Sequence, residues 1–476
     1  MVKVFYTEDI RKMEELTCEQ KQITIKELMY QAGYVLAKDF LSRVMPLVKE
    51  EILVIAGTGN NGGDALVVFQ ELKQNGYNVK LAIIGDAEKG SETFKFYLKM
   101  LPQHIELITM ENIEKAVRKS KFIIDGIFGI GLNRDVSGDF KYLIKLINQA
   151  KKIVYSLDVP SGINADSGLL MGMAIKAKFT GVVGKYKLGN FLNDALDYHG
   201  EIKLLDIGLL EGYSDIYYLD YTDVDLTKDR FHNSYKYSYG HLACIGSSSM
   251  PGAINLSAKA ALRSGVGLVE VFLDQEITRF NEEIIYSNLA EDSTFSKYDV
   301  VVFGPGIKEV TPLYQKVFDQ LIIENKKVIV DAGGLKYLDL KKKYNNIIIT
   351  PHLKELSDIL KMDIETLRKD PITQLRLLAK KGIITLLKGA TTIIQEQRYT
   401  YLLQAKNHGL ATAGTGDVLS GIIASFLVND TSVNSLVKGS AAQMKAADFA
   451  RKKYSEVAMI ASDVIDNLHK VWLKKK

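Results

Sequence analysis

Short runs of β-branched and other apolar residues alternate with longer amphipathic stretches along most of the chain. In the first half the expected strands cover residues 52–55, 79–84, 122–124 and 153–157. Strands that are apolar on both faces and separated by helices are typical of a parallel sheet covered by helices on each side. We therefore expect a doubly wound, Rossmann-like α/β domain, preceded by a pair of helices over 7–43 whose first cap is Thr7.

A second alternation of the same kind begins near residue 240, with expected strands at 242–245, 267–272, 300–303, 327–330 and 347–349. The intervening segment, 213–239, is rich in Asp, Tyr, Ser and Lys and lacks helical apolar spacing. The pattern thus predicts two α/β domains, 1–222 and 223–476.

Composition excludes several classes of protein. A chain of 476 residues with 47% hydrophobic and 25% charged residues is long enough for two ordinary cores. The net charge of +4, without an arginine cluster interleaved with aromatics, argues against a nucleic-acid binder. The two cysteines, Cys18 and Cys244, have no metal-ligand spacing, and no apolar run approaches membrane-spanning length. We expect a cytoplasmic protein that acts on small molecules, does not bind membranes and forms a homo-oligomer.

The most informative segment is 407–418, which contains Gly414-Thr415-Gly416-Asp417 and runs into the apolar stretch 419–427. The glycines allow backbone N–H groups to surround an anion, and the positive end of a buried helix would face it. Asp417, at the helix start, could accept a proton from a substrate hydroxyl. The pattern favours a phosphoryl-transfer site, although many glycine turns simply cap helices.

The first expected strand leads into a polar, glycine-rich stretch at 56–64. Its spacing is not that of the G-x-G-x-x-G dinucleotide motif, because Asn60, Asn61 and Asp64 occupy the turn. Their oxygens suit a monovalent cation or a polar ring. Asp125 and Asp158 follow two further strands, and the carboxyl ends of parallel strands converge on one crevice. A lone Asp at a strand end is often only a cap, so the shared site depends on the three turns together.

These three turns, at 60–64, 125–129 and 157–162, resemble in sequence and order the turns of the NAD(P)H-hydrate epimerase family. The resemblance implies that potassium is coordinated by Asn61, Asp125 and Ser161 and that Asp158 transfers a proton. It also implies that the hydrated nucleotide is bound by Asp158 and by two stretches, Asn60, Asn61, Gly62, Gly63 and Asp64, and Gly129, Ile130, Gly131, Leu132, Asn133, Arg134 and Asp135.

Small-residue turns also follow the expected strands of the second half, at 246–253, 304–306, 350–352 and 388–391. Each of these turns taken alone is common after a strand and indicates no function. Together with 414–417 they resemble the ADP-dependent NAD(P)H-hydrate dehydratase family, which has a ribokinase-like fold. The resemblance implies that the hydrated substrate contacts Ala253, Gly306, His352 and Asp417, and that the adenine nucleotide contacts Lys388, Gly389, Ala390, Thr391, Thr392 and Gly416. His352 could equally be a plain helix cap.

The chain departs from the dehydratase pattern at two places. Asp331-Ala332-Gly333 stands where the family usually has Asp-Ala-Asp, and His408-Gly409 stands where it has Pro-Gly. The first change removes one carboxylate near the expected site, which puts any role of that carboxylate in magnesium or substrate handling in doubt.

The two resemblances imply a fused enzyme that repairs NADHX and NADPHX, the hydrated forms of NADH and NADPH. One half would epimerise the R and S hydrates with potassium. The other would use magnesium and ADP, or ATP, to dehydrate the S form, with AMP and phosphate as products of ADP. Two alternatives remain open: a ribokinase-like kinase of a vitamin precursor or sugar, and an N-terminal half that serves only as a binding or scaffold module.

Overall fold

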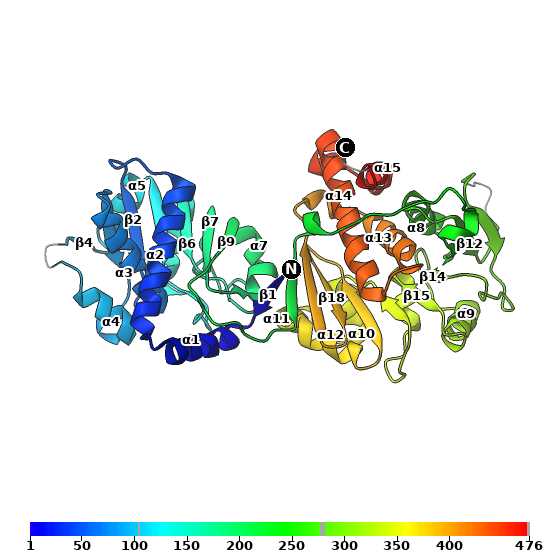
Figure 1. Ribbon diagram of the computed structural model, residues 1–476, viewed down its shortest axis with the longest axis horizontal. Helices are drawn as coiled ribbons and strands as arrows, with labels where there is room; N and C mark the ends of the chain where they lie inside the picture. Colours follow the sequence, from blue (N-terminus) through cyan, green and yellow to red (C-terminus); the bar gives the residue numbers. More distant parts are fainter. Residues whose placement is uncertain (103–104, 277–280, 474–476) are drawn as a thin grey trace. The chain divides into compact units, whose positions relative to one another are not determined.

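The computed structural model describes residues 1–102, 105–276 and 281–473, and its contacts divide the chain into two compact units (Figure 1). The N-terminal unit covers Lys3–Ser214. The C-terminal unit covers Asp215–Lys476 with Met1–Val2. It begins earlier than the expected boundary at 222/223, because strand β10 (Ile216–Leu219) pairs with β19 (Tyr399–Gln404).

The N-terminal unit is built on a parallel sheet with the strand order β4-β3-β2-β5-β6-β7-β9. The neighbouring pairs are all parallel, as the apolar runs predicted. The strands are β2 (Ile52–Ala56), β3 (Val79–Ile83), β4 (Leu107–Ile108), β5 (Phe122–Gly126), β6 (Ile153–Leu157), β7 (Phe179–Val183) and β9 (Glu201–Leu205). A short parallel pair also joins β1 (Val2–Phe5) to β8 (Tyr186–Lys187).

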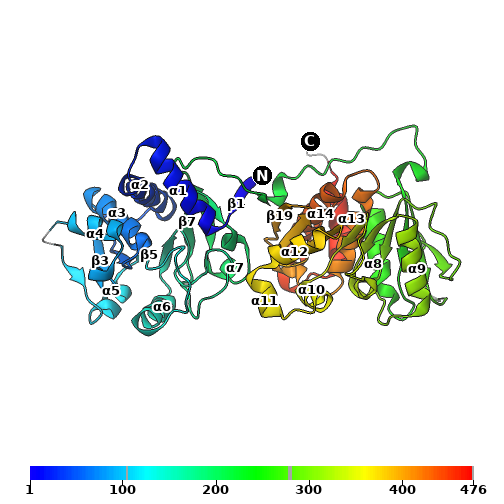
Figure 2. The same ribbon diagram turned by 90° about the horizontal axis from the view of Figure 1, so that it is seen from below.

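Helices cover both faces of this sheet. Along β2, Ile52, Val54 and Ala56 pack into one core, and Leu53 and Ile55 into the other. The first core includes α2 (Ile25–Val44), α3 (Asn60–Gln74) and α4 (Glu92–Lys99), and the second includes α5 (Ile113–Lys119) and α6 (Gly138–Ala150). Figure 2 shows α6 on the opposite side of the strands from α2. The remaining helices of the unit are α1 (Thr7–Lys21), α7 (Ala195–Tyr198) and the short 3-10 turns η1 (Ala87–Lys89) and η2 (Leu188–Phe191).

The two leading helices form as predicted, but the expected cap is wrong. The N-cap of α1 is Tyr6, and Thr7 is already inside the helix. Thr7 instead donates both its N–H and its hydroxyl to the carboxylate of Asp166, at 2.7 and 2.8 Å. This contact ties α1 to a loop that lies 159 residues away in sequence.

The C-terminal unit contains a larger, mostly parallel sheet with the order β13-β12-β11-β14-β15-β16-β17-β18-β19-β10. Only the pairs of β18 with β17 and with β19 are antiparallel among these described strands. Besides β10 and β19, the strands are β11 (His241–Ile245), β12 (Leu268–Leu273), β13 (Ile285–Asn288), β14 (Val300–Phe303), β15 (Lys327–Val330), β16 (Ile347–Ile349), β17 (Ile383–Leu387) and β18 (Thr391–Glu396). The expected α/β class therefore holds in both units.

One core of this unit gathers the helices α8 (Pro251–Arg263), α13 (Thr415–Leu427), α14 (Ser432–Ala458) and α15 (Ala461–Val471) against the strands. Elsewhere, Phe318 of α9 (Pro312–Ile323) packs on Phe303 of β14, with ring centroids 5.3 Å apart. The other helices are α10 (Leu353–Leu360), α11 (Ile364–Lys369) and α12 (Pro371–Ala379), and the 3-10 turns are η3 (Tyr221–Asp223), η4 (Lys236–Tyr239), η5 (Ala332–Tyr337) and η6 (His408–Leu410). Among the described residues, no helix combines the length and the apolarity that crossing a bilayer requires.

Both sheets reverse their strand order in a similar way. In the N-terminal unit the chain leaves β2 for β3 and β4 on one side and later adds β5 and β6 on the other. In the C-terminal unit the same reversal lies between β11 and β14. Ligands of open α/β sheets bind at such switch points, beyond the carboxyl ends of the strands. The polar turns singled out from the sequence follow these strands.

Candidate functional site

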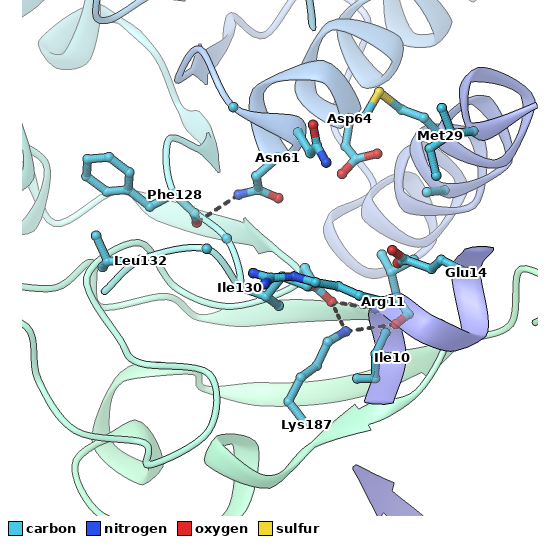
Figure 3. A pocket seen from close by; sticks show the side chains of 18 of the residues that line it. Ile10, Arg11, Glu14, Met29, Asn61, Asp64, Phe128, Ile130, Leu132 and Lys187 are labelled. Carbon is cyan, nitrogen blue, oxygen red and sulfur yellow. Dashed lines mark hydrogen bonds and ion pairs between the residues drawn. The ribbon is translucent and has the colours of Figure 1, made fainter. Parts of the chain in front are cut away.

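A cavity of about 820 Å³ opens at the carboxyl ends of β2, β5 and β6 in the N-terminal unit (Figure 3). Most of the residues expected to bind the hydrate line it, namely Asn60, Asn61, Asp64, Gly129, Ile130, Gly131, Leu132, Asn133, Arg134 and Asp158. Gly62, Gly63 and Asp135 are not among the lining residues. Gly62 instead permits close packing, because a Cβ there would lie 1.9 Å from the carbonyl oxygen of Gly57.

The residues 60–64 form the first turn of α3 rather than a loop, contrary to the sequence expectation. Gly59 is the N-cap in an extended conformation, so the helix starts at the edge of the cavity. The first backbone N–H groups of a helix carry a partial positive charge. The start of α3 therefore offers the cavity both side-chain oxygens and a favourable end for a phosphate.

Asp125 and Ser161, with Asn61, surround the backbone of Phe128. The buried carboxylate of Asp125 accepts hydrogen bonds from the hydroxyl of Ser156 (2.8 Å) and from the N–H of Ser161 (2.9 Å). Nδ2 of Asn61 and the hydroxyl of Ser161 both donate to the carbonyl oxygen of Phe128, at 2.9 and 3.2 Å. A carboxylate, a hydroxyl, an amide and a carbonyl make an all-oxygen donor set, which fits a hard cation such as potassium.

Asp158 lies at the centre of the cavity wall in a left-handed backbone conformation, with φ of 64°. Its Oδ1 accepts the N–H of Val183 at 2.9 Å and forms an ion pair with Nζ of Lys187. Lys187 also donates to the carbonyl oxygen of Val183 at 2.8 Å. Positive φ is strained for a non-glycine residue, and such strain is concentrated at functional sites. The turn thus fixes the carboxylate against a buried cation.

Among the charged residues of this cavity that sequence reasoning missed are Lys187 and Glu14. Lys187 belongs to the two-residue strand β8, which is too short to give a periodic signal. Glu14 follows Ile10 by one helical turn, and Ile10 and Thr17 are buried on the same face of α1. A carboxyl group on the buried face of an amphipathic helix was the signal that could have found it.

Two carboxyl groups in the cavity have a raised pKa. Burial raises the pKa of Glu14 to about 7, with a further contribution from Asp158, against the opposing effect of Lys187. Burial, followed by the charges of Asp158 and Glu14, raises the pKa of Asp64 well above its usual value. Desolvation disfavours the charged form of a carboxyl group.

In the C-terminal unit Lys388, one of the expected nucleotide residues, forms a buried ion pair with Asp331, and its Nζ lies 2.7 Å from Oδ1 of Asp331. Asp331 Oδ2 also accepts the hydroxyl of Ser420 of α13, at 2.6 Å. A Cβ at Gly416 would lie 3.1 Å from Nζ of Lys388, so the ammonium group lies at the start of α13. Burial lowers the pKa of Lys388, but Asp331 and Glu355 outweigh this effect and raise it.

Asp417 occupies the third position of α13, as predicted for the helix start. Its backbone carbonyl accepts the hydroxyl of Ser257 of α8, at 2.8 Å. Burial, and then the neighbouring charge of Asp331, raises the pKa of Asp417 to about 7 despite Lys388. A carboxylate of this kind is a better proton acceptor near neutral pH than an exposed one.

The other expected residues lie on elements that contact this ion pair. Lys388 donates its N–H to the carbonyl of Pro351 at 2.8 Å, which places the turn 350–352 beside it. A Cβ at Gly304 would lie 2.1 Å from the backbone oxygen of Asp331, and one at Gly306 would lie 2.6 Å from that of Met250, next to α8. Ala253 is in the first turn of α8, Gly389 and Ala390 form the turn after β17, and Thr391 and Thr392 are buried at the start of β18.

His352 is the N-cap of α10. Its Nδ1 accepts the N–H of Glu355 at 3.2 Å, and Glu355 accepts the N–H of His352 at 2.8 Å, which is a capping box. The cap that the sequence left open is therefore formed. About half of the His352 side-chain surface, 53%, stays exposed, so the side chain can contact a ligand while it caps α10.

The two departures from the dehydratase pattern have different structural settings. A Cβ at Gly333 would lie 1.7 Å from the carbonyl oxygen of Ile307, so this backbone excludes the usual aspartate. His408 replaces the usual proline at the start of η6, and its Nδ1 lies 3.1 Å from Oε2 of Glu456. Asp331 and Asp417 remain as the carboxylates next to Lys388.

Known families match both halves of the chain. Residues 25–189 match the family described as the YjeF-related protein N-terminus, and residues 242–470 match the family described as NAD(P)H-hydrate dehydratase. A bifunctional NAD(P)H-hydrate repair enzyme of Dictyoglomus turgidum is 30% identical, over 98% of this chain and 97% of that protein. An enzyme of the same name from Coxiella burnetii is 31% identical, over 98% and 99%.

A solved structure of an ADP/ATP-dependent NAD(P)H-hydrate dehydratase from Bacillus subtilis, co-crystallised with ATP and Mg²⁺, is 26% identical to the C-terminal part. It covers 51% of this chain and 92% of that one, with a TM-score of 0.47. The two curated relatives, by contrast, extend across both sites described above. Through that continuous similarity, the chain belongs to the family of bifunctional NAD(P)H-hydrate repair enzymes.

Proposed function

We propose that this protein epimerises the R and S hydrates of NADH and NADPH at the N-terminal cavity and dehydrates the S hydrate at the C-terminal site with ADP and magnesium. The observation that best supports the dehydration is the position of Asp417 on α13, beside the Lys388–Asp331 ion pair and with a pKa near 7. The family membership of the chain supports both halves.

At the dehydratase site, the carboxylate of Asp417 accepts the proton of the ring hydroxyl as its oxygen attacks the terminal phosphorus of the nucleotide. The bond from that phosphorus to AMP breaks, and backbone N–H groups at the start of α13 stabilise the phosphoryl oxygens. Bound magnesium supplies charge neutralisation on the phosphates. Lys388, Gly389, Ala390, Thr391, Thr392 and Gly416 hold the nucleotide, and Ala253, Gly306 and His352 contact the hydrate.

Elimination follows transfer without a second enzyme. Phosphate is a better leaving group than hydroxide, and the lone pair of the adjacent ring nitrogen expels it. The resulting iminium ion loses a proton from the neighbouring ring carbon, which restores the dihydropyridine. The products are NADH or NADPH, inorganic phosphate and AMP in equal amounts.

At the epimerase site, Asn60, Asn61, Asp64, Asp158 and the loop 129–135 bind the hydrate, and potassium bound by Asn61, Asp125 and Ser161 orders that loop. The potassium would neutralise the carboxylate and keep the backbone around Phe128 in place. Asp158, held by Lys187 and the N–H of Val183, transfers the proton of the ring hydroxyl.

The test is to incubate hydrated NADH with the full-length protein, magnesium and either ADP or ATP, and to follow the return of dihydronicotinamide absorbance. We expect equal release of phosphate and NADH, with ADP accepted. Asp417→Ala should abolish this repair yet leave epimerisation measurable by chromatography. Accumulation of a phosphorylated vitamin or sugar, with hydrated NADH ignored, would establish the kinase alternative instead.

A further inference from the structure

Glu14 contributes a half-buried carboxyl group from α1 to the lining of the N-terminal cavity. Among the described residues, none donates a hydrogen bond to it and none forms an ion pair with it. Figure 3 shows its carboxyl group directed from α1 into the space that Asp64 and Lys187 also face. The family match in this half starts at residue 25, after α1, so the comparison assigns nothing to this helix.

The charged neighbours of Glu14 come from every element around the cavity. Asp64 belongs to α3, Asp158 follows β6, Lys187 is in β8, and Arg134 is in the loop after β5. On α1 itself, Arg11, Glu15 and Cys18 line the same space. Among the described residues, the buried Lys187 forms its ion pair with Asp158 and donates to the carbonyl of Val183 rather than pairing with Glu14, although its charge still opposes the rise in the pKa of Glu14.

The carboxyl groups of Asp158 and Glu14 therefore have different surroundings. Asp158 accepts two donors on Oδ1, and no described residue donates to its Oδ2, so a carboxylate oxygen stays available to a ligand. Glu14 has no counterion, and apolar residues of α1 and α2 such as Ile10, Leu28 and Met29 share its part of the cavity. Pairs of titratable groups whose surroundings differ in this way divide acid and base roles between them.

We propose that Glu14 is the proton donor of the epimerase reaction and acts on the hydrate opposite Asp158, an inference that rests on the function proposed above. Inversion at the hydroxyl-bearing carbon requires the ring to open and close. Asp158 takes the hydroxyl proton, the C–O bond becomes a carbonyl, and the bond from that carbon to the ring nitrogen breaks with its electron pair on nitrogen. Glu14 delivers a proton to the nitrogen.

The open form is an aldehyde with a secondary enamine nitrogen, and no oxidant or further reactant is needed. After rotation about the adjacent carbon–carbon bond, the nitrogen attacks the other face of the aldehyde. Glu14 recovers its proton from nitrogen and Asp158 returns one to the oxygen. Both carboxyl groups end in their starting states, so the cycle balances in either direction.

The pKa of Glu14, near 7, gives the sign of the pH dependence. The protonated donor predominates below that pH and is lost above it, so the epimerase kcat should fall as pH rises through about 7. A wild-type profile without this fall would overturn the inference without any variant.

The decisive experiment uses purified R hydrate of NADH, the full-length protein and chiral chromatography, without nucleotide. Glu14→Gln should lower the epimerase kcat on the order of 100-fold, change KM by less than about threefold and remove the fall in rate above neutral pH. Glu19→Gln, on an exposed position of the same helix, is the matched control and should behave as wild type. Unchanged dehydration of the S hydrate and retained hydrate binding verify the folding of the variant.

Two outcomes with the variants would also overturn the assignment. One is a Glu14→Gln variant that keeps the wild-type rate and pH profile. The other is loss of the fall above neutral pH in Asp64→Asn but not in Glu14→Gln, which would make Asp64 the donor. A wild-type protein that does not epimerise the hydrates at all would instead refute the proposed function, so the two failures are distinguishable.

Discussion

Nζ of Lys388 lies 2.7 Å from Oδ1 of Asp331, and the exposed fractions of the two side chains are 19% and 1%. Breaking such a pair leaves a buried charge without its partner. Lys388→Met should therefore destabilise the C-terminal unit by about 3 kcal/mol and abolish nucleotide-dependent dehydration. Calorimetry and the phosphate assay measure the two effects.

The matched control for this change is Lys354→Met. Lys354 forms an exposed pair with Asp358, one turn apart on α10, so its loss should cost less than about 1 kcal/mol. Equal destabilisation by the two substitutions would mean that the pair at Lys388 is no more buried than a surface contact.

Asp417→Asn should stabilise the protein in a pH-dependent way. The pKa of Asp417 is about 7 in the folded protein against 3.8 as the ordinary value. Ionisation is thus disfavoured in the folded state, and its cost grows as pH rises from about 4 and is complete above about 7. At pH 8 the variant should melt roughly 2–4 °C higher than wild type, and at pH 4 the difference should vanish. A variant that melts lower at pH 8 would show that the carboxylate is stabilised by its neighbours.

Asp125→Asn should weaken hydrate binding and remove its dependence on potassium, because the amide lacks the negative charge that attracts a cation. Binding of the hydrate is measured by calorimetry in potassium and in a large organic cation. Asp139→Asn, at an exposed position of α6 outside the cavity lining, is the control and should retain the dependence. Equal affinity of the wild-type protein in both salts would refute the potassium site.

His352→Ala should raise KM for the hydrate much more than KM for the nucleotide, since only one ligand loses a contact. It should also lower stability by about 1 kcal/mol, because the cap of α10 is lost. His352→Asn separates the two roles, as Asn is a good N-cap without an imidazole. If Asn restores both stability and KM, the histidine serves only as a cap.

The apolar runs were enough to predict nine of the parallel strands, because strands buried on both faces carry an uninterrupted hydrophobic signal. These strands are β2, β3, β5, β6, β11, β12, β14, β15 and β16. Strands with a mixed pattern were missed. In Tyr399–Gln404, Thr400 and Gln404 interrupt the aromatic and apolar residues, and Ile216–Leu219 is only four residues long. Their pairing joins segments 184 residues apart. A single-sequence pattern contains no information on such a pairing.

The position of a candidate residue was predictable where a turn follows a strand or a glycine-rich turn leads into a helix, as at Asp158 and Asp417. A candidate residue was not predictable where it lies on an element that has no such turn beside it. Glu14 belongs to a helix that lies before the sheet, and Lys187 to a two-residue strand. The cavity brings both to Asp158, and only tertiary structure reveals that neighbourhood.

The hydrogen bonds from Thr7 to Asp166 and from Leu210 to the hydroxyl of Thr17 span 159 and 193 residues. The helix that carries Glu14 is synthesised well before its two anchors, Asp166 and Leu210, which follow more than 150 residues later. The side of the cavity that α1 forms is therefore completed only after nearly the whole N-terminal unit has been synthesised. A fragment trimmed to residues 25–189 would keep strands β2 to β7 but lack the edge strand β9 and α1, and hence the part of the cavity lining that α1 provides.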